Sequence, residues 1–287
     1  MLGSSNLSGN YTRPPLRGHF DPIDAGSSDS DFYVYSVHLK ADAGSCGQTN
    51  TCDDIRASEA NQVRANADAL GDGENVLIVG DFNMKSSSEG AYANLTAAGN
   101  GQVFDPVNMP GNWFNNNSFK SLHSQDPGGG GGMDDRFDLQ FISGELQTGG
   151  GLDYIDGSYR VFGNNGSHSL NGTLTGNGAA PNVLDALRNA SDHLPVVADY
   201  SFDVSTPGIE VIQSGGTTSV TEGGSTDDFT IVLESAPDSN VVVTVDPDGQ
   251  LDLGNGAGVP IDLTFTPANA LIPQAVSVGA FDDTIVE

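Results

Sequence analysis

Two apolar runs and one periodic segment dominate the first part of the chain. Residues 76–79, Val-Leu-Ile-Val, are consecutively apolar, which predicts a short strand buried on both faces. Residues 32–39 are rich in β-branched and aromatic side chains and predict a second strand. Between them, apolar residues recur at three- and four-residue steps from Asp53 to Leu70, which predicts a helix with Asp53 as its N-cap. A strand, a helix and a strand form a crossover unit, so the pattern favours an α/β layered domain.

Shorter patterns extend this domain to about residue 200. Residues 88–98 and 181–189 predict two short helices, while most of residues 144–190 are rich in Gly and Asn and predict surface loops. A run of five glycines at 128–132 is expected to be flexible linker material inside the domain.

Polar residues stand at the ends of the expected strands. The buried run at 76–79 is followed by Gly80, Asp81 and Asn83, and His38 falls at the end of the strand before it. Gly-Asp and Asn after a strand are also ordinary turn residues. At a strand terminus, however, two side chains offset by two residues project from the same side and can converge on one ligand. The pattern therefore predicts a site at this rim of the sheet.

Two later segments carry similar candidates. Residues 133–143 alternate apolar and polar positions and predict a half-buried strand, with Arg136 and Asp138 on its polar face. Asp192 and His193 open a last apolar strand, where an acid and an imidazole are unusual.

Residues 209–287 form a separate compositional unit after an expected linker at 204–208. Short alternating runs separated by Asp, Gly and Pro predict a β-sandwich. Its expected strands are 209–212, 229–233, 241–245, 261–265 and 275–278. The expected domains are therefore 1–203 and 209–287.

Charge and cysteine content indicate the surroundings of the protein. The formal net charge is -28, and all ten Lys and Arg precede residue 201. Such a surface repels nucleic acid and anionic lipid, so a phosphate substrate would need bridging cations. Acid-rich, lysine-poor surfaces suit calcium-rich or saline surroundings, and Cys46 and Cys52 in a Gly/Ser/Thr loop favour a local disulfide. We expect an extracellular or cell-surface protein, although residues 1–10 carry no visible secretion signal and no apolar run is long enough to span a membrane.

Four motifs occur in a familiar order. With His-Leu at 38–39, Gly-Asp-Phe-Asn at 80–83, Arg-Phe-Asp at 136–138 and Ser-Asp-His-Leu-Pro-Val at 191–196, residues 11–200 resemble the endonuclease/exonuclease/phosphatase superfamily, which includes deoxyribonuclease I. The resemblance implies a four-layered α/β sandwich with two central sheets. It also implies a divalent-metal phosphodiesterase or phosphomonoesterase in which water attacks phosphorus.

The resemblance also assigns roles to the two histidines. His193 would act against the phosphate as a base or charged stabiliser, and Asp138 would hold its other ring nitrogen and fix its tautomer. Asp153 is the alternative partner; Asp138 is preferred because its strand is longer and is preceded by Arg136. His38 would be the acid toward the leaving group.

The remaining implied roles concern water, phosphate and metal. Asp81 would orient or activate the water and contribute to metal binding, and Asn83 would hydrogen-bond a phosphate oxygen. Asp192 would ligate Mg²⁺, or Mn²⁺ or Ca²⁺. In the superfamily an N-terminal half supplies a further Asn and a metal-binding Glu, and nothing before Tyr11 matches either. The first domain is therefore expected to be N-terminally truncated, with part of its metal site missing.

Residues 209–287 show a second resemblance. The segments 220–224, 263–266 and 281–283 resemble a Calx-β module, an immunoglobulin-like sandwich. This implies calcium at one end of the module, with Glu222, Asp282 and Asp283 as ligands, and the module is expected to be C-terminally truncated.

Two functions follow from these patterns. The first is a secreted, metal-dependent phosphoesterase, most simply a nuclease-like phosphodiesterase, with DNA or RNA, sphingolipid and inositol phosphates as open substrate choices. The second is a non-catalytic, calcium-binding surface or adhesion protein with a relic enzyme domain. The motifs leave the oligomeric state open.

Overall fold

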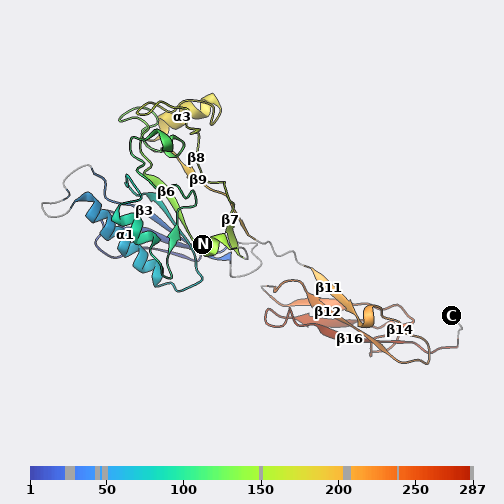
Figure 1. Ribbon diagram of the computed structural model, residues 1–287. Coiled ribbons are helices and arrows are strands. Elements are labelled where there is room, and N and C mark those ends of the chain that lie inside the picture. Colours follow the sequence, from blue (N-terminus) through green and yellow to red (C-terminus); the bar gives the residue numbers. More distant parts are fainter. Residues whose placement is uncertain are drawn as a thin grey trace. The chain divides into compact units, whose positions relative to one another are not determined.

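A computed structural model describes residues 1–22, 30–42, 46, 51–148, 151–202, 208–237 and 239–284. The chain divides into two units, Met1–Asp203 and Val204–Glu287 (Figure 1). The expected linker at 204–208 lies outside the described residues except for Gly208.

A six-stranded mixed sheet is the framework of the first unit. In spatial order its strands are β1 (Gly3–Asn6), β2 (Leu16–Phe20), β3 (Phe32–His38), β4 (Asn75–Asp81), β6 (Asp138–Ser143) and β5 (Val103–Phe104). β3 and β4 run parallel and α1 (Cys52–Asp68) connects them, which confirms the predicted crossover. The other neighbouring strands are antiparallel.

Two helices cover one face of this sheet. Figure 1 shows α1 lying along the face, and α2 (Gly90–Thr96) packs beside it. Ala60, Val63 and Ala67 of α1 join a buried cluster with sheet residues such as Ile78. The predicted N-cap Asp53 is wrong, because α1 begins one residue earlier and Thr51 caps it in a capping box with Asp54.

Among the described residues, two strands and one helical turn cover the opposite face of the sheet. These are β7 (Leu152–Tyr154), β10 (Tyr200–Phe202) and η3 (Glu145–Gln147), and the two strands pair antiparallel. Leu77 and Ile142 of the large sheet pack against Leu146 and Leu152 in a second cluster. Among the described residues, the second sheet implied by the resemblance is thus reduced to a two-stranded ribbon.

A loop-rich region with its own small core completes the first unit. Its elements are η2 (Asn117–Leu122), β8 (Arg160–Val161), α3 (Pro181–Ala190) and β9 (Val196–Val197). Residues such as Met133 and Leu184 form the core. The glycine run at 128–132 is not a linker. A Cβ on Gly128 would lie 2.2 Å from the Arg188 carbonyl oxygen of α3, and one on Gly132 would lie 2.0 Å from the Asn171 carbonyl oxygen, so both ends of the run pack closely against the backbone of other segments.

Arg136 departs from its expected place. β6 begins only at Asp138, and the Arg136 side chain is fully buried instead of lying on a polar strand face. Its guanidinium makes a two-pronged ion pair with Asp105 at 2.7 and 2.8 Å and lies 5.0 Å from the Trp113 ring centroid. These partners satisfy the buried charge.

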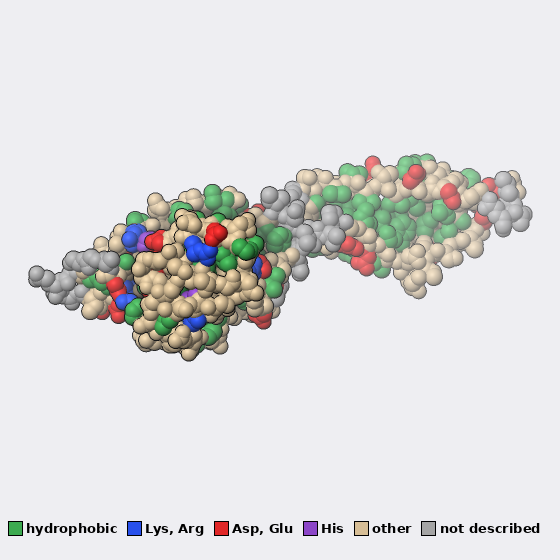
Figure 2. Space-filling view, turned by 90° about the horizontal axis from the view of Figure 1, so that it is seen from above, with side chains coloured by type: hydrophobic (Ala, Val, Ile, Leu, Met, Phe, Trp, Pro, Cys, Tyr) green, Lys and Arg blue, Asp and Glu red, His purple; other side chains and the backbone are tan. Residues whose placement is uncertain are grey.

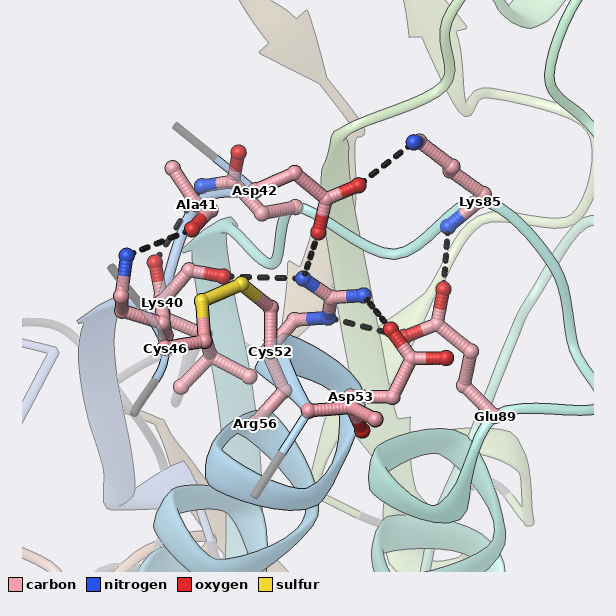
Figure 3. Close-up of polar contacts among 12 residues, drawn as sticks. Lys40, Ala41, Asp42, Cys46, Cys52, Asp53, Arg56, Lys85 and Glu89 are labelled. Carbon is pink, nitrogen blue, oxygen red and sulfur yellow. Dashed lines mark hydrogen bonds and ion pairs between the residues drawn. A yellow bond between two sulfur atoms is a disulfide. The ribbon is translucent and has the colours of Figure 1, made fainter. Parts of the chain in front are cut away.

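A second buried arginine ties together the loops that follow β3 and β4 (Figure 3). Arg56 of α1 donates to Glu89 Oε2 at 2.8 Å, to Asp42 Oδ1 at 2.8 Å and to the Lys40 carbonyl at 3.0 Å, and it also contacts Asp53. The Cys46–Cys52 disulfide lies beside this network and confirms the predicted pairing. The loops that leave the ends of both strands are therefore anchored to the same helix.

The described residues of the second unit form mainly strands. It contains β11 (Ile209–Gln213), η4 (Ser214–Gly216), β12 (Asp227–Leu233), β13 (Val241–Val245), β14 (Leu251–Asp252), β15 (Ile261–Phe265) and β16 (Gln274–Ala280). A four-stranded sheet in the order β11-β12-β16-β14 and a β13-β15 pair share one core around Ile231 and Phe265. Figure 2 shows the Lys and Arg side chains on the first unit and hydrophobic side chains gathered over one face of the second.

Candidate active site

Strand register places three of the predicted residues in one row. In the parallel pairing of β3 with β4, His38 lies directly beside Asp81. In the antiparallel pairing of β4 with β6, Asp81 lies directly beside Asp138. Directly paired residues project to the same face of a sheet, with neighbouring side chains about 5 Å apart. Three separate sequence segments therefore meet at one rim.

Gly80 makes the close approach of β3 and β4 possible at this rim. Its φ is +135°, and a Cβ at this position would lie 2.0 Å from the Val37 carbonyl oxygen. Any side chain here would clash with the backbone just before His38, so the glycine of the motif has a steric cause.

Asn83 fixes the carboxylate of Asp81. The Asn83 backbone N–H donates to Asp81 Oδ1 at 2.9 Å, and its Nδ2 donates to Asp81 Oδ2 at 2.9 Å and to the Leu39 carbonyl at 3.2 Å. His38 Nε2 lies 3.2 Å from the same Oδ2. Both Nδ2 hydrogens of Asn83 are thus engaged within the protein, so its side chain orients Asp81 instead of being directed at a ligand.

His193 completes the cluster from a distant segment. Its Nδ1 lies 2.7 Å from Asp138 Oδ2, and the Ser124 hydroxyl donates to the same oxygen at 2.6 Å. The segment that carries His193 is held by a bridge to Gln125 and by the Leu194 N–H, which donates to the Ser124 carbonyl at 2.7 Å. Ser124 was not predicted, since nothing in its local sequence distinguishes it from other loop serines.

The structure distinguishes between the two candidate partners of His193. Asp138 is its hydrogen-bond partner, whereas Asp153 lies in β7 opposite Ser201. The expectation that Asp192 and His193 open a strand is wrong, because β9 begins at Val196. Pro195, which has no N–H to donate, separates the bridge at His193 from that strand.

Neighbouring charges and burial set the protonation of the site. The hydrogen bond to Asp138 and the negative charges of Asp138, Asp81 and Asp192 outweigh burial and raise the pKa of His193 to about 9. Burial and then the Asp138 carboxylate raise the pKa of Asp81 above its usual range. His193 is therefore an imidazolium at neutral pH, hydrogen-bonded to one carboxylate and close to another.

The predicted metal ligands do not form a complete protein site. In the part of the chain that the structure describes, no three His, Cys, Asp or Glu side chains are grouped so as to hold a metal ion. Asp81 uses both carboxylate oxygens on Asn83 and His38, while Asp192 is exposed next to His193. Mg²⁺ is often held by one or two carboxylates together with substrate phosphates and water, and the exposed carboxylate of Asp192 fits that mode of binding.

A polar cavity of about 480 Å³ adjoins the segment that carries His193. It is bounded by the glycine run at 128–130, by Asp126, and by residues 188–192 at the end of α3 and just beyond it. The Asp126 N–H donates to the Asp192 carbonyl at 2.7 Å, which fixes one wall beside the candidate metal ligand.

The calcium ligands expected in the second unit are partly brought together. The Asp283 N–H donates to Glu222 Oε1 at 3.4 Å, and Asp282 is exposed next to it. Within the described residues these acids do not form a three-ligand group.

No family model matches the chain, and no curated protein matches it. Solved structures are similar to it over most of its length. The human Nocturnin catalytic domain with bound sulfate is 14% identical, with a TM-score of 0.43, over 70% of this chain and 59% of that one. An endonuclease/exonuclease/phosphatase family protein from Bacteroides thetaiotaomicron is 18% identical, with a TM-score of 0.37, over 69% and 59%.

A third similar structure is D. rerio TDP2 complexed with a single-strand DNA product, which is 14% identical with a TM-score of 0.41, over 70% of this chain and 67% of that one. The chain spans about three fifths of the Nocturnin and Bacteroides chains. Among the described residues, no helix is both long and apolar enough to cross a membrane.

Proposed function

We propose that the first unit is a phosphoesterase in which an activated water hydrolyses a phosphate ester. The observation that supports this most strongly is the hydrogen-bonded pair of His193 and Asp138 beside Asp81. Hydrolysis at phosphorus needs a stabiliser for the negative oxygens, a positioned water and a proton for the leaving oxygen. The cluster offers one group for each of these needs.

Each role follows from the protonation and contacts of the residue. His193 is cationic at neutral pH, which suits it to stabilise the phosphate charge and leaves it unable to accept a proton. Asp81, oriented by Asn83, is a carboxylate with a raised pKa and is suited to orient the water and accept its proton. His38, at 3.2 Å from Asp81, is the candidate acid toward the leaving group.

A divalent cation belongs to the proposal. Asp192 would hold Mg²⁺, Mn²⁺ or Ca²⁺ together with the phosphate, and the cation would neutralise charge on the phosphate oxygens. We further propose that the substrate is a phosphodiester such as DNA or RNA and that the protein acts outside the cell. The Cys46–Cys52 disulfide and the acidic composition support that location.

The test uses the full chain, a DNA oligonucleotide and bis(p-nitrophenyl) phosphate with Mg²⁺, Mn²⁺ or Ca²⁺, each with and without EDTA. We expect chelator-sensitive hydrolysis that falls by about 10²- to 10³-fold in His193→Ala, because one stabiliser of the phosphate charge is lost. His19→Ala is the matched control, since His19 pairs with Asp31 and stacks on Tyr33 outside the cluster. Metal-dependent hydrolysis that is the same in His193→Ala and the unaltered protein would overturn the assignment.

The alternative is a non-catalytic, calcium-binding extracellular protein whose second unit is a Calx-β-like, immunoglobulin-like module. The contact between Glu222 and Asp283 supports this alternative, because it brings two of the expected calcium ligands together at one end of the second unit. An increase in melting temperature with calcium, lost in Glu222→Gln, without hydrolysis of any ester would support this function over the first.

A further inference from the structure

Phe114 exposes an aromatic ring on a segment that is fixed to the loop after Asn83. The Trp113 and Phe114 N–H groups both donate to the Lys85 carbonyl, at 2.8 and 3.3 Å. Trp113 is fully buried and anchors the segment, whereas 39% of Phe114 is exposed. The backbone of Phe114 is therefore held in place, while much of its side chain faces solvent.

Lys85 fixes the side chain as well as the backbone of this pair. Its Nζ lies 5.0 Å from the Phe114 ring centroid, within the range of a cation–π contact. Its own N–H donates to Glu89 Oε1 at 2.7 Å, which links it to the Arg56 network (Figure 3). Lys85 follows Asn83 by two residues, and two residues span at most about 7 Å. The pair thus adjoins the loop that orients Asp81.

The positive charge of Lys85 is paired with a carboxylate, and this limits which ligands Lys85 and Phe114 can bind. Its ammonium lies 2.5 Å from Asp42 Oδ2 (Figure 3). A phosphate group would have to compete with this carboxylate for the ammonium. A flat, uncharged aromatic ring needs no such competition and gains stacking energy on Phe114.

We propose that Phe114, held by Lys85, is a subsite that stacks one base of a nucleotide substrate beside the hydrolysed phosphate. This rests on the proposed phosphoesterase function and narrows its substrate to esters that carry an aromatic base, such as nucleic acid. Lipid and inositol phosphates lack such a ring. Stacking of a base on an aromatic side chain also compensates for a surface whose net charge repels polyanions.

The experiment compares hydrolysis of a thymidine dinucleotide with hydrolysis of glycerophosphoglycerol, a phosphodiester without an aromatic ring. In Phe114→Ala the ratio of kcat/KM for the two substrates should fall by about 5- to 100-fold, mainly through KM for the dinucleotide. Phe114→Trp should keep the ratio, because it restores the stacking surface. Phe104→Ala is the control: Phe104 is 38% exposed but lies at the other end of β6 from Asp138, opposite Ile142, and its loss should leave the ratio as it is.

A direct binding measurement separates this subsite from the proposed activity. Calorimetry with thymidine 5′-monophosphate and Mg²⁺ should show weaker binding to Phe114→Ala than to the unaltered protein, whether or not any ester is hydrolysed. An active enzyme in which Phe114→Ala affects both diesters equally and binds the nucleotide normally would overturn the subsite and leave the phosphoesterase intact. Normal nucleotide binding by both proteins, without hydrolysis of either diester, would overturn both.

Discussion

Replacing Asp138 by Asn removes the charge beside His193 while preserving the shape of the side chain. Asp138 is the largest cause of the raised pKa of His193, through a hydrogen bond of 2.7 Å and its negative charge. We expect the pKa of His193 in Asp138→Asn to fall from about 9 toward the ordinary value of 6.5. The neighbouring carboxylates of Asp81 and Asp192 keep part of the increase.

The size of the effect follows from proton linkage. Folded His193 holds its proton up to about pH 9, whereas the unfolded chain releases it near 6.5. The imidazolium therefore stabilises the fold fully below pH 6.5, and this contribution, about 3 kcal/mol, is lost as the pH rises through 9. About 2 kcal/mol of it should be lost between pH 7.5 and 9.5. The side chain is 24% exposed, so solvent screens it only in part.

NMR titration of the His193 ring and urea unfolding at pH 7.5, 8.5 and 9.5 measure both quantities. The range begins at pH 7.5 because burial and Asp134 raise the pKa of Asp135 to about 7, and that group also titrates below this range. The free energy of unfolding of the unaltered protein should fall as the pH rises from 7.5 to 9.5. In Asp138→Asn this free energy should change much less with pH. Asp199→Asn, which removes an exposed carboxylate paired with Arg160, should behave like the unaltered protein. Titration of His193 near 6.5 in the unaltered protein would refute the reasoning.

Three further predictions concern the framework. Arg136→Met should lower the free energy of unfolding, measured in urea, by about 3 to 5 kcal/mol, because it leaves the Asp105 carboxylate buried and unpaired. Arg160→Met, which removes an exposed ion pair, is the control and should lower it by less than about 1 kcal/mol. Gly80→Ala should lower the melting temperature sharply through its clash with Val37, whereas Gly3→Ala, with open space around it, should not; equal melting temperatures would contradict the steric argument. Burial lowers the pKa of His168 to about 4. Between pH 6.5 and 4 the unfolded chain therefore binds this proton and the folded chain does not, so the fold loses stability as the pH falls. His168→Leu should reduce the loss of melting temperature over that range.

Local patterns predicted the elements that carry the site. The apolar run at 76–79 and the helical periodicity after Asp53 define β4 and α1, and a right-handed crossover is nearly obligatory for parallel neighbours. Once these strands are parallel, their carboxyl ends meet at one edge, so the approach of His38 to Asp81 follows. The longer alternating pattern around Asp138 correctly separated it from Asp153 as the partner of His193.

Three features that the sequence did not predict are contacts between distant segments. Alternation placed Arg136 on a polar face, but its partner Asp105 lies 31 residues earlier in a segment without periodicity. Gly128 resembles linker sequence, yet the carbonyl of Arg188 leaves no room for a side chain there. The Ser124 hydroxyl donates a hydrogen bond to Asp138, which lies 14 residues later in the sequence. None of these pairs leaves a local signal, because each is decided by packing after the chain has folded.

The order of ionisable groups across the rim explains why two carboxylates can lie side by side. Asp81 and Asp138 are paired on adjacent strands, an arrangement that repels when both are ionised. Each has a histidine on its outer side, since His38 lies 3.2 Å from Asp81 and His193 lies 2.7 Å from Asp138. The row therefore reads imidazole, carboxylate, carboxylate, imidazole across β3, β4, β6 and the segment before β9. Loss of His193 would leave the carboxylate pair without its neighbouring imidazolium, and an incoming cation would relieve the repulsion that results.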